Sequence, residues 1–192
     1  LVDCFIKNTT EKDEGKGEKF STDSERLLYS ACIFYLLDHC DDEGMKNFSS
    51  VLKMINSSKV DEQGKTMEKS PLDRLFDVLA EDSLAKKYYT AFCQSPSRTR
   101  MSIIISCLSR LQPFMIRDVI SLTSSDSINL NRICEEKTAL FLITPSESEY
   151  PYNFLASMLY SQPFDTLYSK GLKKGLETGS ERLPYPVRCM MD

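Results

Sequence analysis

Several groups of residues in this sequence have types and spacings that could support chemistry, and Gly64-Lys65-Thr66 matches the end of a phosphate-binding P-loop. A complete loop would place another glycine at position 59, after a buried strand, so that backbone amides surround the phosphates. Position 59 is Lys59, and the residues that follow it are polar. We therefore interpret the tripeptide as part of a surface loop and expect no P-loop in this chain.

His39 is the only histidine, which restricts both metal binding and acid–base catalysis. Cys40 follows it directly, but neighbours on a helix point in different directions and cannot act as a dyad. We interpret His39 as the end of a helix, where a cation is favourable to the helix dipole. The cysteines are odd in number and lack any CxxC pair, so no zinc site is expected; they are Cys4, Cys32, Cys40, Cys93, Cys107, Cys134 and Cys189. Several lie in apolar helical patterns, which indicates reduced thiols in a reducing cytoplasm.

A stretch rich in cations could contact phosphates. It contains no acidic residue, whereas charges elsewhere are mixed and Asp38, Asp41, Asp42 and Glu43 form an acidic cluster. Each phosphate that such a stretch neutralises would release a counterion. The same residues could instead be solvated charge on the outside of two helices, and both interpretations stay open. The candidate binding residues are Lys86, Lys87, Arg98, Arg100, Arg110 and Arg117.

Asp192 follows the apolar run Val187 to Met191. A carboxylate at the end of a buried parallel strand can meet the Mg²⁺ of a bound nucleotide, because ligands gather at the carboxyl ends of such strands. Since many strands end in Asp, this pattern alone is a weak indication.

Composition limits what the whole chain can be. Its 192 residues are 41% hydrophobic and 27% charged, which supplies a core and argues against global disorder. The net charge of −4 means that the chain as a whole is not a basic nucleic-acid binder. The longest apolar run, Ala31 to Leu37, is far shorter than the roughly 20 residues of a membrane-spanning helix.

Helical spacing of apolar residues dominates from Thr22 to about Asp118. Thr22 and Glu25 match a capping box, Ser70-Pro71 matches an N-cap with proline in the first turn, and Ser83 and Ser97 are further N-cap candidates. Met45 to Ile55 is expected to be another helix, and a shorter one is expected after Pro113. The polar segments 11–19 and 57–70 are expected to be loops. This pattern predicts a compact bundle of five or six helices.

The pattern changes near Lys137. Ala139 to Ile143 is a short apolar run ended by Thr144-Pro145, which is typical of a buried strand. Phe154 to Tyr168 is predicted to be a helix interrupted near Pro163, and a polar connection with Gly171, Gly175 and Gly179 precedes the second apolar run. Strand, helix and strand in this order predict a βαβ unit of a parallel sheet. The predicted fold is therefore mainly α, a helical bundle followed by a βαβ remnant of an α/β domain.

Stretches along nearly the whole chain resemble, in order, the coupling proteins of bacterial conjugation and type IV secretion, the TraG-type DNA-translocating ATPases. Pro163 departs from the family, which more often has an aliphatic residue there, and this puts the straightness of the helix in doubt. The matching stretches are LVDCFIKNTT, SERLLYSACIFYL, KSPLDRLF, RTRMSIIISCLSRLQPF, KTALFLITPSESEYPYNFLASMLYSQPFDTLY and RLPYPVRCMMD.

The resemblance implies an all-α substrate-recognition domain at 1–136, inserted into a RecA-like nucleotide-binding domain to which 137–192 return. On this mapping Asp192 matches the Walker B aspartate, which is catalytic and binds Mg²⁺ in the complete protein. ATP and Mg²⁺ are then cofactors of the complete ATPase, whereas this chain, lacking a P-loop, is expected to bind neither and to hydrolyse nothing alone.

The resemblance also implies a hexameric motor anchored at the cytoplasmic side of the bacterial cell membrane. Its expected partners are a relaxase, relaxosome accessory proteins or effector proteins, secretion-channel components and single-stranded DNA. This chain is expected to be a monomer, because hexamers of the family depend mainly on the nucleotide-binding domain. Two alternatives stay open from the residues: a free-standing helical protein-interaction domain without a motor, and a DNA-binding bundle that uses the basic stretch.

Overall fold

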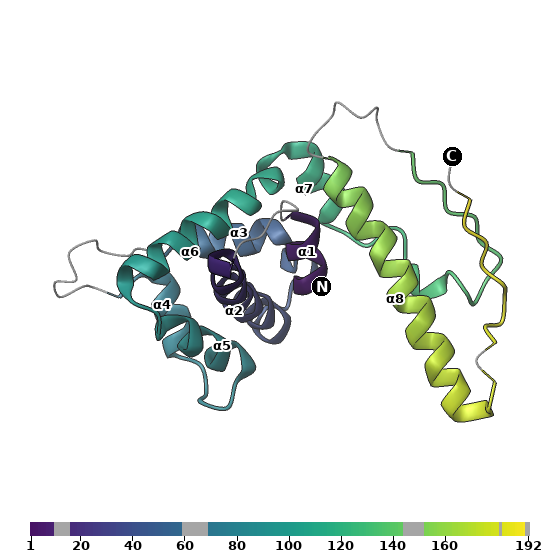
Figure 1. Cartoon of the computed structure of the whole chain (residues 1–192), viewed down its shortest axis with the longest axis horizontal. Coiled ribbons are helices and arrows are strands. Elements are labelled where there is room, and N and C mark those ends of the chain that lie inside the picture. The colour runs from purple at the N-terminus through teal and green to yellow at the C-terminus, as the bar shows by residue number, and fades with distance from the viewer. Residues whose placement is uncertain (10–15, 59–68, 144–151, 181, 191–192) are drawn as a thin grey trace. The chain divides into compact units, whose positions relative to one another are not determined.

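The computed structural model of the chain is mainly helical (Figure 1). It describes residues 1–9, 16–58, 69–143, 152–180 and 182–190. The chain separates into two compact units, Leu1–Ser125 and Asp126–Asp192. The predicted assignment of 1–136 and 137–192 to two functional domains stays a prediction, since it concerns the complete ATPase.

The first unit is built from α-helices, as the sequence predicts, but its described residues form seven of them rather than the expected five or six. Two 3-10 turns, η1 (Glu43–Met45) and η2 (Gln112–Met115), lie between them. The α-helices are α1 (Val2–Thr9), α2 (Lys16–His39), α3 (Phe48–Asn56), α4 (Pro71–Asp77), α5 (Leu84–Cys93), α6 (Ser97–Arg110) and α7 (Arg117–Thr123).

Helix α2 is the centre of this unit, and α1, α3, α5 and α6 all contact it. In Figure 1 it is seen almost along its axis, among its neighbours. Leu28, Tyr29, Ala31 and Cys32 are all fully buried, and Ser30 between them is 8% exposed. Because successive helical residues point in different directions, burial of such a run requires neighbours on several sides of the helix.

The aromatic core of the first unit begins at α1, a helix that the periodicity did not predict. Phe5 is fully buried, and its ring centroid lies 5.3 Å from that of Tyr29 and 4.7 Å from that of Phe48. Phe114 lies 4.8 Å from Phe48 and closes the cluster. The hydroxyl of Tyr29 donates to the carbonyl of Cys107 at 2.9 Å, which satisfies the buried polar atom.

Some predicted helix starts are confirmed and others are wrong. Ser70 caps α4 in a capping box with Asp73, as Ser70-Pro71 indicated. Ser83 stands at the N-cap of α5 without a side-chain cap bond, and the N-cap of α6 is Pro96 rather than Ser97. The predicted capping box of Thr22 and Glu25 is wrong, since both residues lie inside α2.

The predicted loop 11–19 is also wrong from position 16 onward, where α2 begins, and 11–15 lie outside the described residues. The helix expected from Met45 begins later, at Phe48, where the Asn47 side chain accepts a hydrogen bond from the Ser50 amide. In each case tertiary packing or a better cap overrides the local pattern.

The second unit contains η3 (Leu130–Arg132) and one long helix, α8 (Tyr152–Thr178). Lys170 on α8 contacts the Asn131 carbonyl and forms a 2.6 Å ion pair with Glu135. The predicted interruption at Pro163 is wrong, because α8 continues through this residue. The predicted polar connection is wrong too: Gly171 and Gly175 are helical, and the helix ends before Gly179, whose φ of 70° suits glycine.

The described residues form no strand, so the predicted βαβ remnant of a RecA-like sheet is not supported. Residues 139–143 and 187–190 lie outside any helix, and Thr144-Pro145 fall outside the described part. A strand is stabilised by hydrogen bonds to a neighbouring strand, and neither segment has such a neighbour among the described residues. Of the three predicted elements, the helix alone is found.

Candidate functional site

The structure divides the six candidate basic residues into an engaged group and a free group. Lys86, Arg100 and Arg110 make hydrogen bonds inside the first unit. Lys87, Arg98 and Arg117 are exposed, and their side chains have no ion pair or hydrogen bond to any described residue. The free cations lie on three helices, α5, α6 and α7. Half of the six predicted cations are therefore available to bind a phosphate or an acidic partner.

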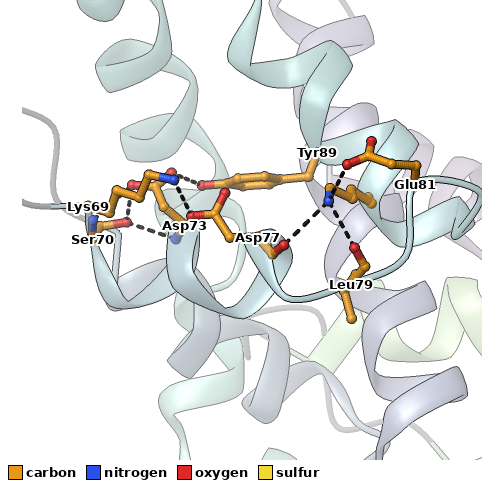
Figure 2. Close-up of polar contacts among 8 residues, drawn as sticks. Lys69, Ser70, Asp73, Asp77, Leu79, Glu81 and Tyr89 are labelled. Carbon is orange, nitrogen blue, oxygen red and sulfur yellow. Dashed lines mark hydrogen bonds and ion pairs between the residues drawn. The ribbon is translucent and has the colours of Figure 1, made fainter.

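Lys86 stabilises the turn between α4 and α5 through contacts with Asp77, Leu79 and Glu81, which Figure 2 labels. Its ammonium donates to the carbonyl of Leu79 at 2.8 Å and pairs with Glu81 at 2.7 Å, and it also reaches the carbonyl of Asp77. The last carbonyls of a helix lack partners within the helix, and a cation there is favourable to the dipole. Lys86 is thus a structural residue, with 17% of its side chain exposed.

Arg110 forms a buried ion pair with Glu25, whose side chain is only 1% exposed. The Arg110 Nε donates to Glu25 at 2.6 Å, and its Nη1 donates to the carbonyl of Thr9 at 2.7 Å. The hydroxyl of Ser106 donates to the same carboxylate at 2.6 Å. This network joins the end of α1 to α2 and α6, and its hydrogen bonds are what make burial of the two charges tolerable.

A second polar network joins α4 to α5, and the sequence indicated only one member of it, the N-cap residue Ser70. The Asp73 carboxylate accepts hydrogen bonds from the Ser70 amide at 2.9 Å and from the Tyr89 hydroxyl at 2.6 Å (Figure 2). Burial works to raise the pKa of Asp73, but the hydrogen bonds from Tyr89 and Ser70 outweigh it and hold the pKa below its ordinary value. Burial, together with the bond to Asp73, raises the pKa of Tyr89.

Arg100 lies near this network and is half-buried. Its Nη2 donates to the Ser97 hydroxyl at 3.4 Å, and its buried Nε has no hydrogen-bond partner. The positive charge of Arg100 helps to lower the pKa of Asp73. Arg100 therefore balances the charge of a structural carboxylate.

A surface hollow between α2 and α6 holds one of the free cations. Its volume is about 270 Å³, and its described lining residues are Ser21, Arg98, Thr99, Ser102 and Ile103. Ile103 is 1% exposed and lies at the base, whereas Arg98 and Ser102 are exposed at the rim. Sequence reasoning identified Arg98 but missed the three hydroxyl residues, because no motif connects Ser21 to positions 98–102.

The other candidate sites give limited information. Asp192 and Gly64-Lys65-Thr66 lie outside the described residues, so their roles stay predictions. His39 ends α2 and is exposed, with its ring 5.4 Å from that of Tyr35. All seven cysteines are free, and burial raises the pKa of the Cys32 thiol to about 12. The described residues include no group of three His, Cys, Asp or Glu side chains that could hold a metal ion.

No helix in the described ranges has both the length and the apolar character needed to cross a membrane. Helix α8 is long enough, but its sequence includes several lysines and acidic residues.

Comparison with known proteins gives one match. A family model described as type IV secretory system conjugative DNA transfer matches residues 4–192, nearly the whole chain. No curated protein matches the sequence, and no solved structure matches the fold.

Proposed function

The chain belongs to the type IV secretory system conjugative DNA transfer family, and from this premise we propose that it supplies the substrate receptor of a coupling ATPase. In this proposal residues 1–136 recognise the relaxosome, its DNA or an effector protein, and 137–192 are part of the nucleotide-binding domain. The receptor brings its cargo to the secretion channel.

The observation that carries the proposal is a contrast in burial. The first unit buries many of its large apolar side chains in a core of its own, whereas the second unit leaves several of its own exposed. The first unit has its own aromatic core and two internal polar networks. A unit with such a core can be inserted into another domain and keep its fold. This independence is what a receptor domain requires if it is to bind cargo while the motor domain changes its nucleotide state.

The second unit supports the other half of the proposal, because it leaves large apolar side chains uncovered. Phe141 is 83% exposed, Ile143 is 90% exposed and Met190 is 85% exposed. Exposure of this kind in segments rich in strand-forming residues marks a surface that another part of a protein covers. We propose that further strands of the nucleotide-binding domain cover it and that residues 139–143 and 187–190 become strands when those neighbours are present.

Exposed apolar residues also follow one line along α8. They recur every fourth residue, a spacing that places them on one ridge of the helix. A helix ridge of this kind packs against a sheet or another helix in an α/β domain. The residues are Tyr160, Phe164, Tyr168, Leu172 and Leu176.

In the complete protein the proposed cofactors are ATP and Mg²⁺, with Asp192 as the Walker B aspartate that binds the metal. The proposed partners are a relaxase and its accessory proteins, single-stranded DNA and components of the secretion channel. The complete protein is proposed to be a hexamer at the cytoplasmic side of the membrane, and this chain a monomer.

Binding of a purified relaxosome from the same conjugation system tests the receptor role. We expect the chain to bind it in biolayer interferometry, and we expect Arg117→Glu, which reverses a free cation of the basic stretch, to weaken binding. Lys53→Glu is the matched control, since Lys53 is an exposed cation on α3 outside that stretch. No binding by the unchanged chain would contradict the receptor role.

Asp192→Asn in the complete protein tests the assignment of the second unit. Loss of the carboxylate removes a ligand of the nucleotide-bound Mg²⁺, so we expect hydrolysis of ATP to fall to background. Relaxosome binding is expected to be unchanged because the receptor is a separate unit. Normal hydrolysis would contradict the Walker B assignment, and loss of both activities would contradict the separation of roles.

A further inference from the structure

We propose that the hollow between α2 and α6 is a binding site for a phosphate group, held by Arg98 and by the hydroxyls of Ser21, Thr99 and Ser102. The site deepens the receptor function and rests on it for the source of the phosphate, the backbone of a transferred DNA strand. The binding chemistry itself depends only on the residues of the first unit.

Arg98 supplies the charge that the site requires. It lies in the first turn of α6, its side chain is exposed, and the guanidinium has no ion pair or hydrogen bond to any residue the structure describes. Guanidinium groups bind phosphate through two parallel N–H···O bonds. Lys86 and Arg110, by contrast, are already paired with Glu81 and Glu25.

Hydroxyl groups supply the remaining donors. Thr99 and Ser102 are three residues apart and so lie on the same face of α6, and Arg98 is one turn before Ser102. The Ser102 hydroxyl donates to the Arg98 carbonyl at 3.2 Å, and the Ser21 hydroxyl makes a long 3.4 Å bond to Glu25. Hydroxyl hydrogens rotate to suit their partners, so each group can donate to a phosphate oxygen instead.

The electrostatic surroundings favour an anion in the hollow. The first turn of α6 carries the positive end of a helix dipole. The Glu25 carboxylate, which accepts the Ser21 hydroxyl, is paired with Arg110, and Asp23 on the same helix is paired with Arg26. The sequence contains no acidic residue from Lys86 to Arg117. The described carboxylates beside Ser21 on α2 are therefore each paired with an arginine, which reduces their repulsion of a phosphate.

The position of the site suits a phosphate within a strand. Ile103 closes the base, whereas Arg98 and Ser102 are exposed at the rim, so the hollow opens to solvent. A strand can pass over the rim and place one phosphate inside. Since contacts to phosphate carry no sequence information, we expect no sequence preference.

The experiment compares two ligands that share the phosphate chemistry, an oligothymidylate and inorganic phosphate. Binding of the labelled oligothymidylate to the whole chain is followed by fluorescence anisotropy at two salt concentrations, and binding of either ligand is followed by amide chemical shifts. Arg98→Gln is expected to weaken oligothymidylate binding by about tenfold, the loss of one charged hydrogen-bonded contact. Lys53→Gln, which removes an exposed cation on α3 outside the basic stretch, is the control and should change the affinity by less than about twofold.

A second variant distinguishes binding by a specific set of donors from attraction by positive charge alone. Thr99→Val with Ser102→Ala keeps every charge but removes two hydroxyl donors, and we expect it to weaken binding by about fivefold. Thermal unfolding of each variant establishes that the unit stays folded, which we expect because these side chains are at the surface.

The outcomes are distinct. If oligothymidylate binds with the Arg98 dependence, DNA supplies the phosphate. If only inorganic phosphate shifts the amides of Thr99 and Ser102, the site stands with a free anion as its ligand. If neither ligand binds, or if Arg98→Gln and Lys53→Gln weaken binding equally, the proposal is overturned. If the chain binds the relaxosome but no phosphate, the receptor function is supported and the phosphate site is not. If it binds phosphate but no relaxosome, the phosphate site is supported and the receptor function is not.

Discussion

The two units of this chain use their apolar and charged residues in opposite ways. In Leu1–Ser125 the aromatic rings of Phe5, Phe48 and Phe114 pack on one another, and the buried charges meet partners. In Asp126–Asp192 one long helix is flanked by segments whose largest side chains, such as Phe141, are exposed. The described residues of the first unit cover most of one another's large apolar side chains, whereas those of the second unit leave several exposed.

The contrast is clearest for charged pairs of similar length. The Glu25–Arg110 pair is 2.6 Å long and buried, and it joins helices far apart in the sequence. The Arg132–Glu136 pair is 2.5 Å long but more than half exposed on both sides, and it joins residues four apart. Distance alone therefore says little about what an ion pair contributes, since solvent screening decides it.

Removal of a core ring is expected to have the largest effect and to separate the two units most strongly. Phe114→Ala deletes a ring that is 1% exposed and leaves a cavity beside Phe5 and Phe48. We expect the free energy of unfolding to fall by about 3–5 kcal/mol, as measured by urea unfolding followed by circular dichroism. Phe164→Ala, at a ring that is 47% exposed on α8, should change it by less than about 0.5 kcal/mol. Equal effects would contradict the contrast.

Disruption of the buried ion pair is expected to rank next. Arg110→Met leaves the Glu25 carboxylate buried without its cation, which should destabilise the first unit by about 3 kcal/mol. The double variant with Glu25→Gln removes the unpaired charge and should recover part of this loss. Arg132→Met is the matched control in the second unit and should cost less than about 0.5 kcal/mol. A small effect of Arg110→Met would show that water reaches the Glu25 carboxylate, although the Glu25 side chain is only 1% exposed.

A smaller effect is expected at Asp73, and it depends on pH. Because hydrogen bonds lower the pKa of Asp73 in the folded state, its contribution to stability is present above its unfolded value of about 3.9. The contribution is lost as the pH falls below that value through the folded pKa. Asp73→Asn should therefore lower the melting temperature at pH 6 more than at pH 3.

Asp118→Asn, at an exposed carboxylate on α7, is the control for the Asp73 prediction and should show little difference between the two pH values. If Asp73→Asn lowered the melting temperature equally at both pH values, the destabilisation would come from the altered hydrogen-bonding geometry of the amide and not from the missing charge.

The sequence allowed much of the first unit to be predicted, for physical reasons that differ between elements. Ser70-Pro71 predicted the start of α4 because a local hydrogen bond, between Ser70 and Asp73, decides it. Thr22 and Glu25 led to a wrong prediction because they match the spacing of a capping box. The residue that pairs with Glu25 in the structure, Arg110, is distant in the sequence. Helix α1 was not predicted because it is short and because the burial of its Phe5 depends on Phe48 and Phe114.

The candidate site was predictable only in part for the same reason. Six cations were visible in the sequence, but their division depends on which carboxylates and carbonyls the fold brings to them. Lys86 and Lys87 are adjacent, yet the first is held by Leu79 and Glu81 and the second is free. In the second unit, composition predicted strands at 139–143 and 187–191, but a strand also requires a partner, which composition does not report.

Hydrogen exchange followed by mass spectrometry, on this chain and on the proposed complete protein side by side, tests the central claim most directly. The account predicts that amides of α2, α5 and α6 exchange slowly and equally in both proteins, because the first unit is closed by itself. Residues 139–143 and 187–190 should exchange rapidly in this chain and become protected in the complete protein. Equal protection of these segments in both would contradict the claim, and so would rapid exchange of α2 in this chain.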